Sequence, residues 1–65
     1  MRIHCLGGGL VGSFVTRRLV EAGFEVHLYD VVERESPATF HLGDALTSDH
    51  SQAEIIVNML PGYLG

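Results

Sequence analysis

A glycine-rich turn, set between an apolar run and a helical pattern, is the feature that most constrains how this chain folds. The turn follows the apolar run 2–6 and comprises Gly7-Gly8-Gly9-Leu10-Val11-Gly12. Gly7 can take a tight bend, Gly9 leaves no side chain between the main chain and a ligand, and Gly12 lets the helix pack close to the strand. The amides that open the helix, at the positive end of its dipole, attract a diphosphate. The pattern therefore predicts a dinucleotide-binding turn, with pyrophosphate contacts from Gly7, Gly9, Leu10, Val11 and Gly12.

A carboxylate stands where such a fold holds the adenosine ribose. Asp30 closes the second apolar run, 25–29, and follows the glycines by roughly the 20 residues typical of this motif. A carboxylate at this position accepts both ribose hydroxyls and repels a 2′-phosphate, which favours NAD as the cofactor. Arg34 follows shortly afterwards and can pair with a 2′-phosphate, so NADP is the alternative.

Composition and charge exclude several other classes of protein. The chain has 65 residues, 46% hydrophobic and 18% charged, which predicts one small folded domain over 1–65. A net charge of −4 argues against a nucleic-acid partner, and no apolar stretch approaches the ~20 residues that insert across a membrane. A single cysteine cannot form an internal disulfide, which favours a cytoplasmic location. Because lysine is absent, a phosphate-loop lysine and a Schiff-base nucleophile are excluded.

The apolar runs predict four strands and one long helix. Strands are expected at 2–6, 25–29, 39–42 and 55–60, and Pro61-Gly62 ends the last one. The helix is expected to run from Leu10 to Gly23, where glycine can take a positive φ. Its buried stripe is expected to comprise Val11, Phe14, Val15, Leu19 and Ala22.

The connections between the strands predict the topology. The second crossover, 31–38, is shorter than the roughly ten to twelve residues that a helical crossover needs, so at most one helical turn or an extended return is expected. The segment 43–54 has room for a short helix around 48–53. Together these features predict an α/β fold, half of a doubly wound (Rossmann) parallel sheet in strand order 3-2-1-4 with a shortened second crossover. Nucleotide would bind where the strand order reverses.

Four stretches carry a resemblance to a known family: 5–12, 26–30, Gly43-Asp44-Ala45 and Val57-Asn58-Met59-Leu60-Pro61-Gly62. With them the chain resembles, over almost its whole length, the amino-terminal NAD(P)-binding part of the saccharopine dehydrogenase-like oxidoreductases. The resemblance implies that Asp44 lies near the adenine and that Asn58, Leu60 and Pro61 line the dinucleotide. It implies hydride transfer between a nicotinamide and a small amino-acid-type or hydroxy-acid-type substrate. A substrate domain or second half-sheet is then expected outside these residues, and the catalytic residues stay unassigned.

Two further families share parts of the pattern. The β-hydroxyacid dehydrogenases have a similar glycine turn, with stretches like Glu21-Ala22-Gly23, Tyr29-Asp30 and Met59-Leu60-Pro61. The nucleotide-sensing regulatory domains of potassium transport systems share the glycine turn, the strand-end acid and Gly43-Asp44-Ala45. A sensor that binds nucleotide without catalysis is therefore the alternative to an oxidoreductase. A homo-oligomer, or an isolated fragment without activity, is also open.

The other reactive side chains have ordinary structural interpretations. The histidines show no spacing typical of metal ligands, so no metal site is predicted among His4, His27, His41 and His50. The first three are expected to fill or flank sheet faces, and His50 is expected to be solvated. Cys5 is expected to be buried rather than nucleophilic. For Asp44, capping of a turn is as good an interpretation as adenine contact.

Overall fold

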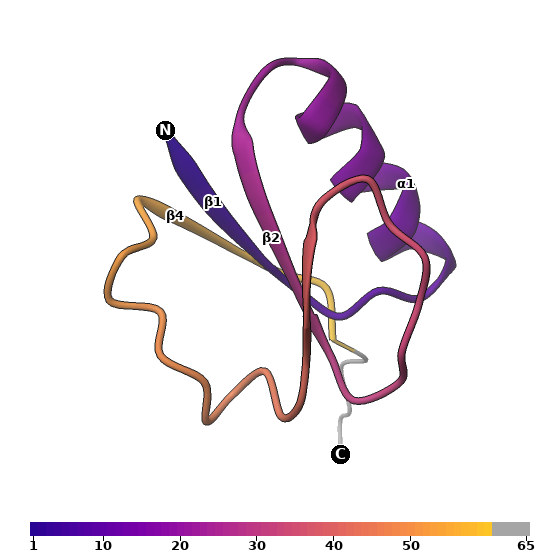
Figure 1. Ribbon diagram of the computed structural model, residues 1–65, viewed down its shortest axis with the longest axis vertical. Coiled ribbons are helices and arrows are strands. Elements are labelled where there is room, and N and C mark those ends of the chain that lie inside the picture. The colour runs from indigo at the N-terminus through magenta and orange to yellow at the C-terminus, as the bar shows by residue number, and fades with distance from the viewer. Residues whose placement is uncertain (61–65) are drawn as a thin grey trace.

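A four-stranded parallel sheet with one helix forms the chain, and the computed structural model describes residues 1–60 (Figure 1). The strands are β1 (Arg2–Leu6), β2 (Glu25–Asp30), β3 (Thr39–Leu42) and β4 (Ile55–Asn58), in the order β3-β2-β1-β4. All three pairings are parallel. This is the predicted half of a doubly wound sheet, and the strand order reverses between β1 and β4.

Side-chain alternation along the two central strands gives the sheet two different faces. On one face Ile3, Cys5, Val26 and Leu28 form the main core, against which Leu19 and Val20 of the helix pack. On the other face Leu6 and Tyr29 pack against Ala45 of the segment that follows β3. Cys5 has no exposed surface, which confirms its predicted burial, and this burial raises the pKa of its thiol.

The helix α1 (Leu10–Glu21) ends as the sequence predicts. Gly23 has a φ of 95°, and its amide donates to the Val20 carbonyl while the Phe24 amide donates to the Leu19 carbonyl. These two bonds satisfy carbonyl groups that have no partner inside the helix, and they require a residue that tolerates positive φ. Glycine at position 23 therefore fixes the turn into β2.

The predicted buried stripe of α1 is only partly right: Leu19 packs against the core, but most of the stripe does not face it. Val11, Phe14 and Ala22 are exposed, whereas Gly12 and Thr16 are the buried helix residues. A Cβ added at Gly12 would collide with the Gly7 carbonyl oxygen, so the helix lies against the turn at this point. This close approach turns the small residues toward the sheet and part of the apolar stripe away from it.

Two predictions about the connections have different outcomes. The segment 31–38 contains no helix and returns in extended form, as its length predicts. The helix expected around 48–53 is absent, since these residues form only bends and turns. Local bonds compete with helix formation there: the Ser51 amide donates to the Asp49 carboxylate, and the Ser48 hydroxyl donates to the Asp44 carbonyl. The strand β4 also ends earlier than expected, because the Asn58 side chain accepts a hydrogen bond from the Leu60 amide.

Candidate functional site

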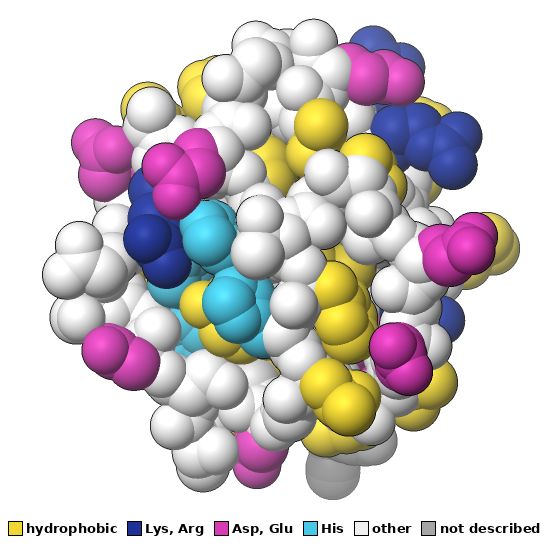
Figure 2. All heavy atoms as spheres, in the orientation of Figure 1, with side chains coloured by type: hydrophobic (Ala, Val, Ile, Leu, Met, Phe, Trp, Pro, Cys, Tyr) yellow, Lys and Arg dark blue, Asp and Glu magenta, His cyan; other side chains and the backbone are white. Residues whose placement is uncertain are grey.

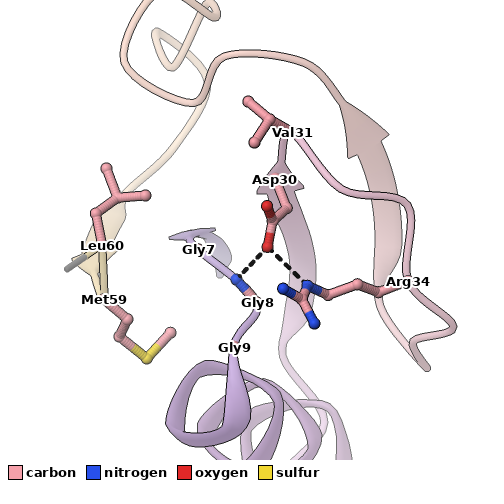
Figure 3. Close-up of a pocket in the computed structure, with 8 residues that line it drawn as sticks. All are labelled: Gly7, Gly8, Gly9, Asp30, Val31, Arg34, Met59 and Leu60. Atoms are coloured by element: carbon pink, nitrogen blue, oxygen red, sulfur yellow. Dashed lines mark hydrogen bonds and ion pairs between the residues drawn. The ribbon is translucent and has the colours of Figure 1, made fainter.

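A pocket of about 290 Å³ lies at the carboxyl ends of β1, β2 and β4. Figure 3 shows Met59 and Leu60 on one side of the glycine turn and Asp30 with Arg34 on the other. In open parallel sheets, ligands bind at this edge where the strand order reverses. Among residues 1–60 the lining comprises Gly7, Gly8, Gly9, Asp30, Val31, Arg34, Met59 and Leu60.

The glycines of the turn have different structural roles. Gly7 has a φ of 97° and donates its amide to the Tyr29 carbonyl at 2.8 Å. A Cβ on Gly7 would lie 3.0 Å from the Met59 carbonyl oxygen, so the turn and the end of β4 are in tight contact. A Cβ on Gly9, in contrast, would meet nothing within 4 Å. The absence of a side chain at Gly9 therefore keeps free space beside the backbone rather than serving internal packing.

The first backbone amides of α1 have no hydrogen-bond partner among residues 1–60. Within residues 1–60 no hydrogen bond is made by the amides of Leu10, Val11 or Gly12, and the Ser13 amide is the first to bond, to the Gly9 carbonyl. No side chain caps the helix at Gly9. The first turn carries no acidic residue either. Helix amides without partners, together with the positive end of the helix dipole, form a binding site for an anion.

Asp30 is the most connected polar side chain of the pocket. Its Oδ2 accepts hydrogen bonds from the Gly8 amide at 2.7 Å and from Arg34 Nε at 2.8 Å, and its Oδ1 accepts one from the Val32 amide at 3.1 Å (Figure 3). We refer to Asp30, Gly8, Val32 and Arg34 as the Asp30 cluster.

The Asp30 cluster keeps the carboxylate ionised. Partial burial raises the pKa of Asp30, but the bonds from Arg34 and from the two amides outweigh it and hold the pKa below its ordinary value. The negative charge is therefore fixed between the glycine turn and the arginine. A carboxylate has about four acceptor positions, so the cluster leaves one for a further donor.

The predicted site residues are brought together only in part. Gly7, Gly9, Asp30 and Leu60 line the pocket, and Leu10, Val11 and Gly12 form the first turn of α1 beside it. Asp44 and Asn58 do not line it. Asp44 accepts a hydrogen bond from the Leu46 amide at 2.9 Å, which is the capping role weighed for it. Pro61 lies outside the described residues.

Gly8, Val31 and Arg34 also line the pocket, although the glycine motif singles out neither Gly8 nor Val31. A Cβ on Gly8 would lie 2.9 Å from Arg34 Cδ and 3.0 Å from Asp30 Oδ2. In the sequence, the only sign of this role is a third glycine, Gly8, between the motif positions Gly7 and Gly9. The lack of a side chain at Gly8 makes room for the Asp30 cluster.

Comparisons with known proteins add no identification: no protein-family model matches the chain, and no curated protein is significantly similar to it. The resemblance to the saccharopine dehydrogenase-like oxidoreductases accordingly stays a prediction. Within residues 1–60 no helix is both long and apolar enough to cross a membrane.

Proposed function

We propose that this chain binds NAD in the pocket at the glycine turn, as the cofactor-binding portion of an oxidoreductase. The observation that carries the proposal is the free first turn of α1, whose amides lack partners within the described residues beside the open space at Gly9. A diphosphate needs both features, donors without partners and a backbone that it can approach. When bound, the nicotinamide supplies the hydride chemistry, and the protein supplies binding and orientation.

Asp30 favours NAD over NADP in this proposal. Its carboxylate is ionised and has an acceptor position left for a ribose hydroxyl, whereas a 2′-phosphate beside it would be repelled. The nearby Arg34 is already paired with Asp30, which neutralises the one cation that lines the pocket among the described residues. A 2′-phosphate would have to break this ion pair to gain the arginine.

Calorimetric titration with NAD and with NADP tests the proposal. Wild-type protein is expected to bind NAD more tightly, and Asp30→Ala is expected to weaken NAD binding about tenfold or more, since it removes a charged acceptor of the ribose. The same variant frees Arg34, so its preference is expected to shift toward NADP.

Two matched variants serve as controls. Glu33→Ala makes the same change in net charge at an exposed position of the segment 31–38, which follows Asp30. It is expected to leave the affinities for NAD and NADP unchanged. Arg34→Ala is expected to retain the NAD preference. Equal NAD affinity in wild type and Asp30→Ala would remove the role given to Asp30, and no binding of either nucleotide to wild type would overturn the proposed function.

A further inference from the structure

All four histidines gather on the sheet face opposite α1. Figure 2 shows their side chains as one patch beside an arginine and acidic groups. His4 of β1 and His27 of β2 are paired in register, His41 of β3 stacks on Tyr29, and His50 reaches the patch from the segment 43–54. We call His4, His27, His41, His50 and Tyr29 the histidine face. The predicted solvation of His50 is wrong, because both of its ring nitrogens are hydrogen-bonded.

One chain of hydrogen bonds on this face fixes the tautomer of two histidines. Arg2 Nε donates to His4 Nε2 at 2.9 Å, so a neutral His4 must carry its proton on Nδ1. That proton is donated to His50 Nδ1 at 2.7 Å, and His50 must then carry its own proton on Nε2. His50 Nε2 lies 2.6 Å from the Ala45 carbonyl oxygen, the acceptor that this tautomer requires. Every bond of the chain is satisfied only when both rings are neutral.

An additional proton would break this chain at either ring. On His4 it would sit on Nε2 and face the N–H of Arg2, and on His50 it would sit on Nδ1 and face the N–H of His4. His4 has no exposed surface, so water cannot solvate a charge there. Burial first, and then the positive charge of Arg2, lower the pKa of His4.

The neighbouring pair, His27 and His41, has a different set of hydrogen-bond partners. His27 Nε2 donates to the Glu25 carboxylate at 2.9 Å, and His27 Nδ1 lies 2.9 Å from His41 Nε2. Because His27 Nε2 is the donor to Glu25, His27 Nδ1 accepts its bond from His41 Nε2 when both rings are neutral. Burial lowers the pKa of His41 as well, but neither ring of this pair is hydrogen-bonded to the segment 43–54.

Other charged groups near His4 and His50 do not stabilise an additional proton on either ring. Arg2 lies on β1 and is paired with Glu25 of β2 at 3.6 Å. Glu54 binds the backbone amide of Arg2 and lies 3.9 Å from the terminal amine. Asp49, beside His50, is exposed and already bonded to the Ser51 amide. In the described residues none of these carboxylates bonds to His4 or His50, so none stabilises an additional proton by direct contact.

We propose that the His4–His50 bond is a pH-sensitive latch that holds the segment 43–54 on the sheet at neutral pH and releases it in mild acid. The segment packs Ala45 against Leu6 and Tyr29, and it leads into β4, after which come the pocket residues Met59 and Leu60. The described residues contain no group of three or more His, Cys, Asp or Glu side chains placed to hold a metal ion.

The sign of the effect follows from the lowered pKa of His4. Above about pH 6.5, the ordinary histidine pKa, both the closed and the released forms hold His4 neutral and the latch has its full strength. As the pH falls below this value, the released form takes up a proton that the closed form resists. The latch therefore weakens with acid until the pH reaches the lowered pKa of the closed form.

Amide hydrogen exchange measured by NMR, without nucleotide, tests the latch. The Ala53 amide donates to the His50 carbonyl at 3.0 Å and reports on the segment, while the Gly7 amide, bonded to Tyr29, reports on the β1–β2 core. Protection at Ala53, corrected for intrinsic exchange, is expected to fall about tenfold between roughly pH 7.5 and pH 5.5, with a smaller change at Gly7. Imidazole nitrogen shifts at neutral pH are expected to show His4 protonated on Nδ1 and His50 protonated on Nε2.

Two variants separate the latch from a general effect of acid. The double variant His4→Gln/His50→Gln keeps an amide donor for the Ala45 carbonyl and removes both titratable rings of the latch, so its Ala53 protection is expected to be nearly independent of pH. His41→Gln removes an imidazole from the same face and leaves the His4–His50 bond, so it is expected to retain the pH dependence. The latch is overturned by equal losses at Ala53 and Gly7, by unchanged Ala53 protection in wild type, by a double variant as sensitive as wild type, or by the opposite tautomers.

Discussion

Two glycines of the same motif are expected to respond differently to the same added methyl group. At Gly12 a Cβ collides with the backbone carbonyl of Gly7, which cannot move without shifting the turn. Alanine favours a helix over glycine by about 1 kcal/mol, but overpacking of this kind costs about 1–3 kcal/mol, and contact with backbone places it at the upper end. Gly12→Ala is therefore expected to lower the free energy of unfolding by about 2 kcal/mol, measured by urea denaturation.

Gly9→Ala is the matched variant. Gly9 has a φ of −62°, which alanine adopts freely, and its Cβ would meet open space. The variant is expected to lose at most about 1 kcal/mol of stability through poorer capping of the helix. Under the proposed function it is nevertheless expected to lose NAD affinity, because the methyl group fills the diphosphate space. A Gly9→Ala protein that unfolds as easily as Gly12→Ala would contradict the distinction.

Asp30 is expected to stabilise the folded chain in a pH-dependent way. Its pKa is depressed in the folded protein, so its stabilising effect is complete above the unfolded pKa of about 3.9 and is lost as the pH falls through the folded pKa. Asp30→Asn is expected to lower the free energy of unfolding by about 1–3 kcal/mol at neutral pH, since bonds to a charged group are replaced by bonds to an amide.

Urea denaturation of wild type and Asp30→Asn over a pH series measures this effect. Their difference in the free energy of unfolding cancels the contribution of the histidine face, which both proteins share. It is expected to be constant above about pH 5 and to shrink below about pH 4. A difference that grows with acid would show that the carboxylate is destabilising when ionised.

At the level of elements, the orientation of α1 about its axis separates its apolar residues into two classes. Leu19 packs against the main core, whereas Phe14 is 63% exposed and its ring is contacted by Arg18. Leu19→Ala is expected to cost about 2 kcal/mol in the free energy of unfolding, the low end for a leucine because it is only half-buried. Phe14→Ala is expected to cost less than about 1 kcal/mol. Equal losses of unfolding free energy in the two variants would mean that Phe14 packs against the sheet as Leu19 does.

This orientation shows where sequence patterns lose predictive power. The spacing of apolar residues is enough to predict the position of α1, since any amphipathic stripe produces it. The close approach of the helix backbone to the glycine turn decides instead which residues of α1 face the sheet. This approach brings Gly12 against Gly7, and the spacing of apolar residues does not reveal it. The absence of a helix at 48–53 has a similar cause, because the side chains of Asp44 and Asp49 accept bonds from nearby backbone amides, which a pattern of polar residues does not specify.

At the level of the whole molecule, the sheet order and the location of the pocket follow from the sequence, while the chemistry around Asp30 does not. Strand, glycine turn, helix and acid are consecutive, and a parallel sheet brings the ends of its strands to one edge. The bond from Arg34 to Asp30 depends on the path of an irregular loop, 31–38, for which no periodic signal exists. The histidine face is hidden for the same reason, since His50 comes from another irregular segment.

A chain of this size is expected to show NAD binding as a large shift in its melting temperature. Only the folded state has the pocket, so nucleotide at about 100 times its dissociation constant adds about 2.7 kcal/mol to the free energy of unfolding. For a domain of this length each kcal/mol raises the melting temperature by about 4–8 °C, which gives a shift of roughly 10–20 °C. Thermal denaturation at increasing NAD concentrations measures it, and the shift is expected to rise with the logarithm of concentration once the site is saturated. Gly9→Ala should show a much smaller shift, and an equal shift in both proteins would mean that the nucleotide binds away from the glycine turn.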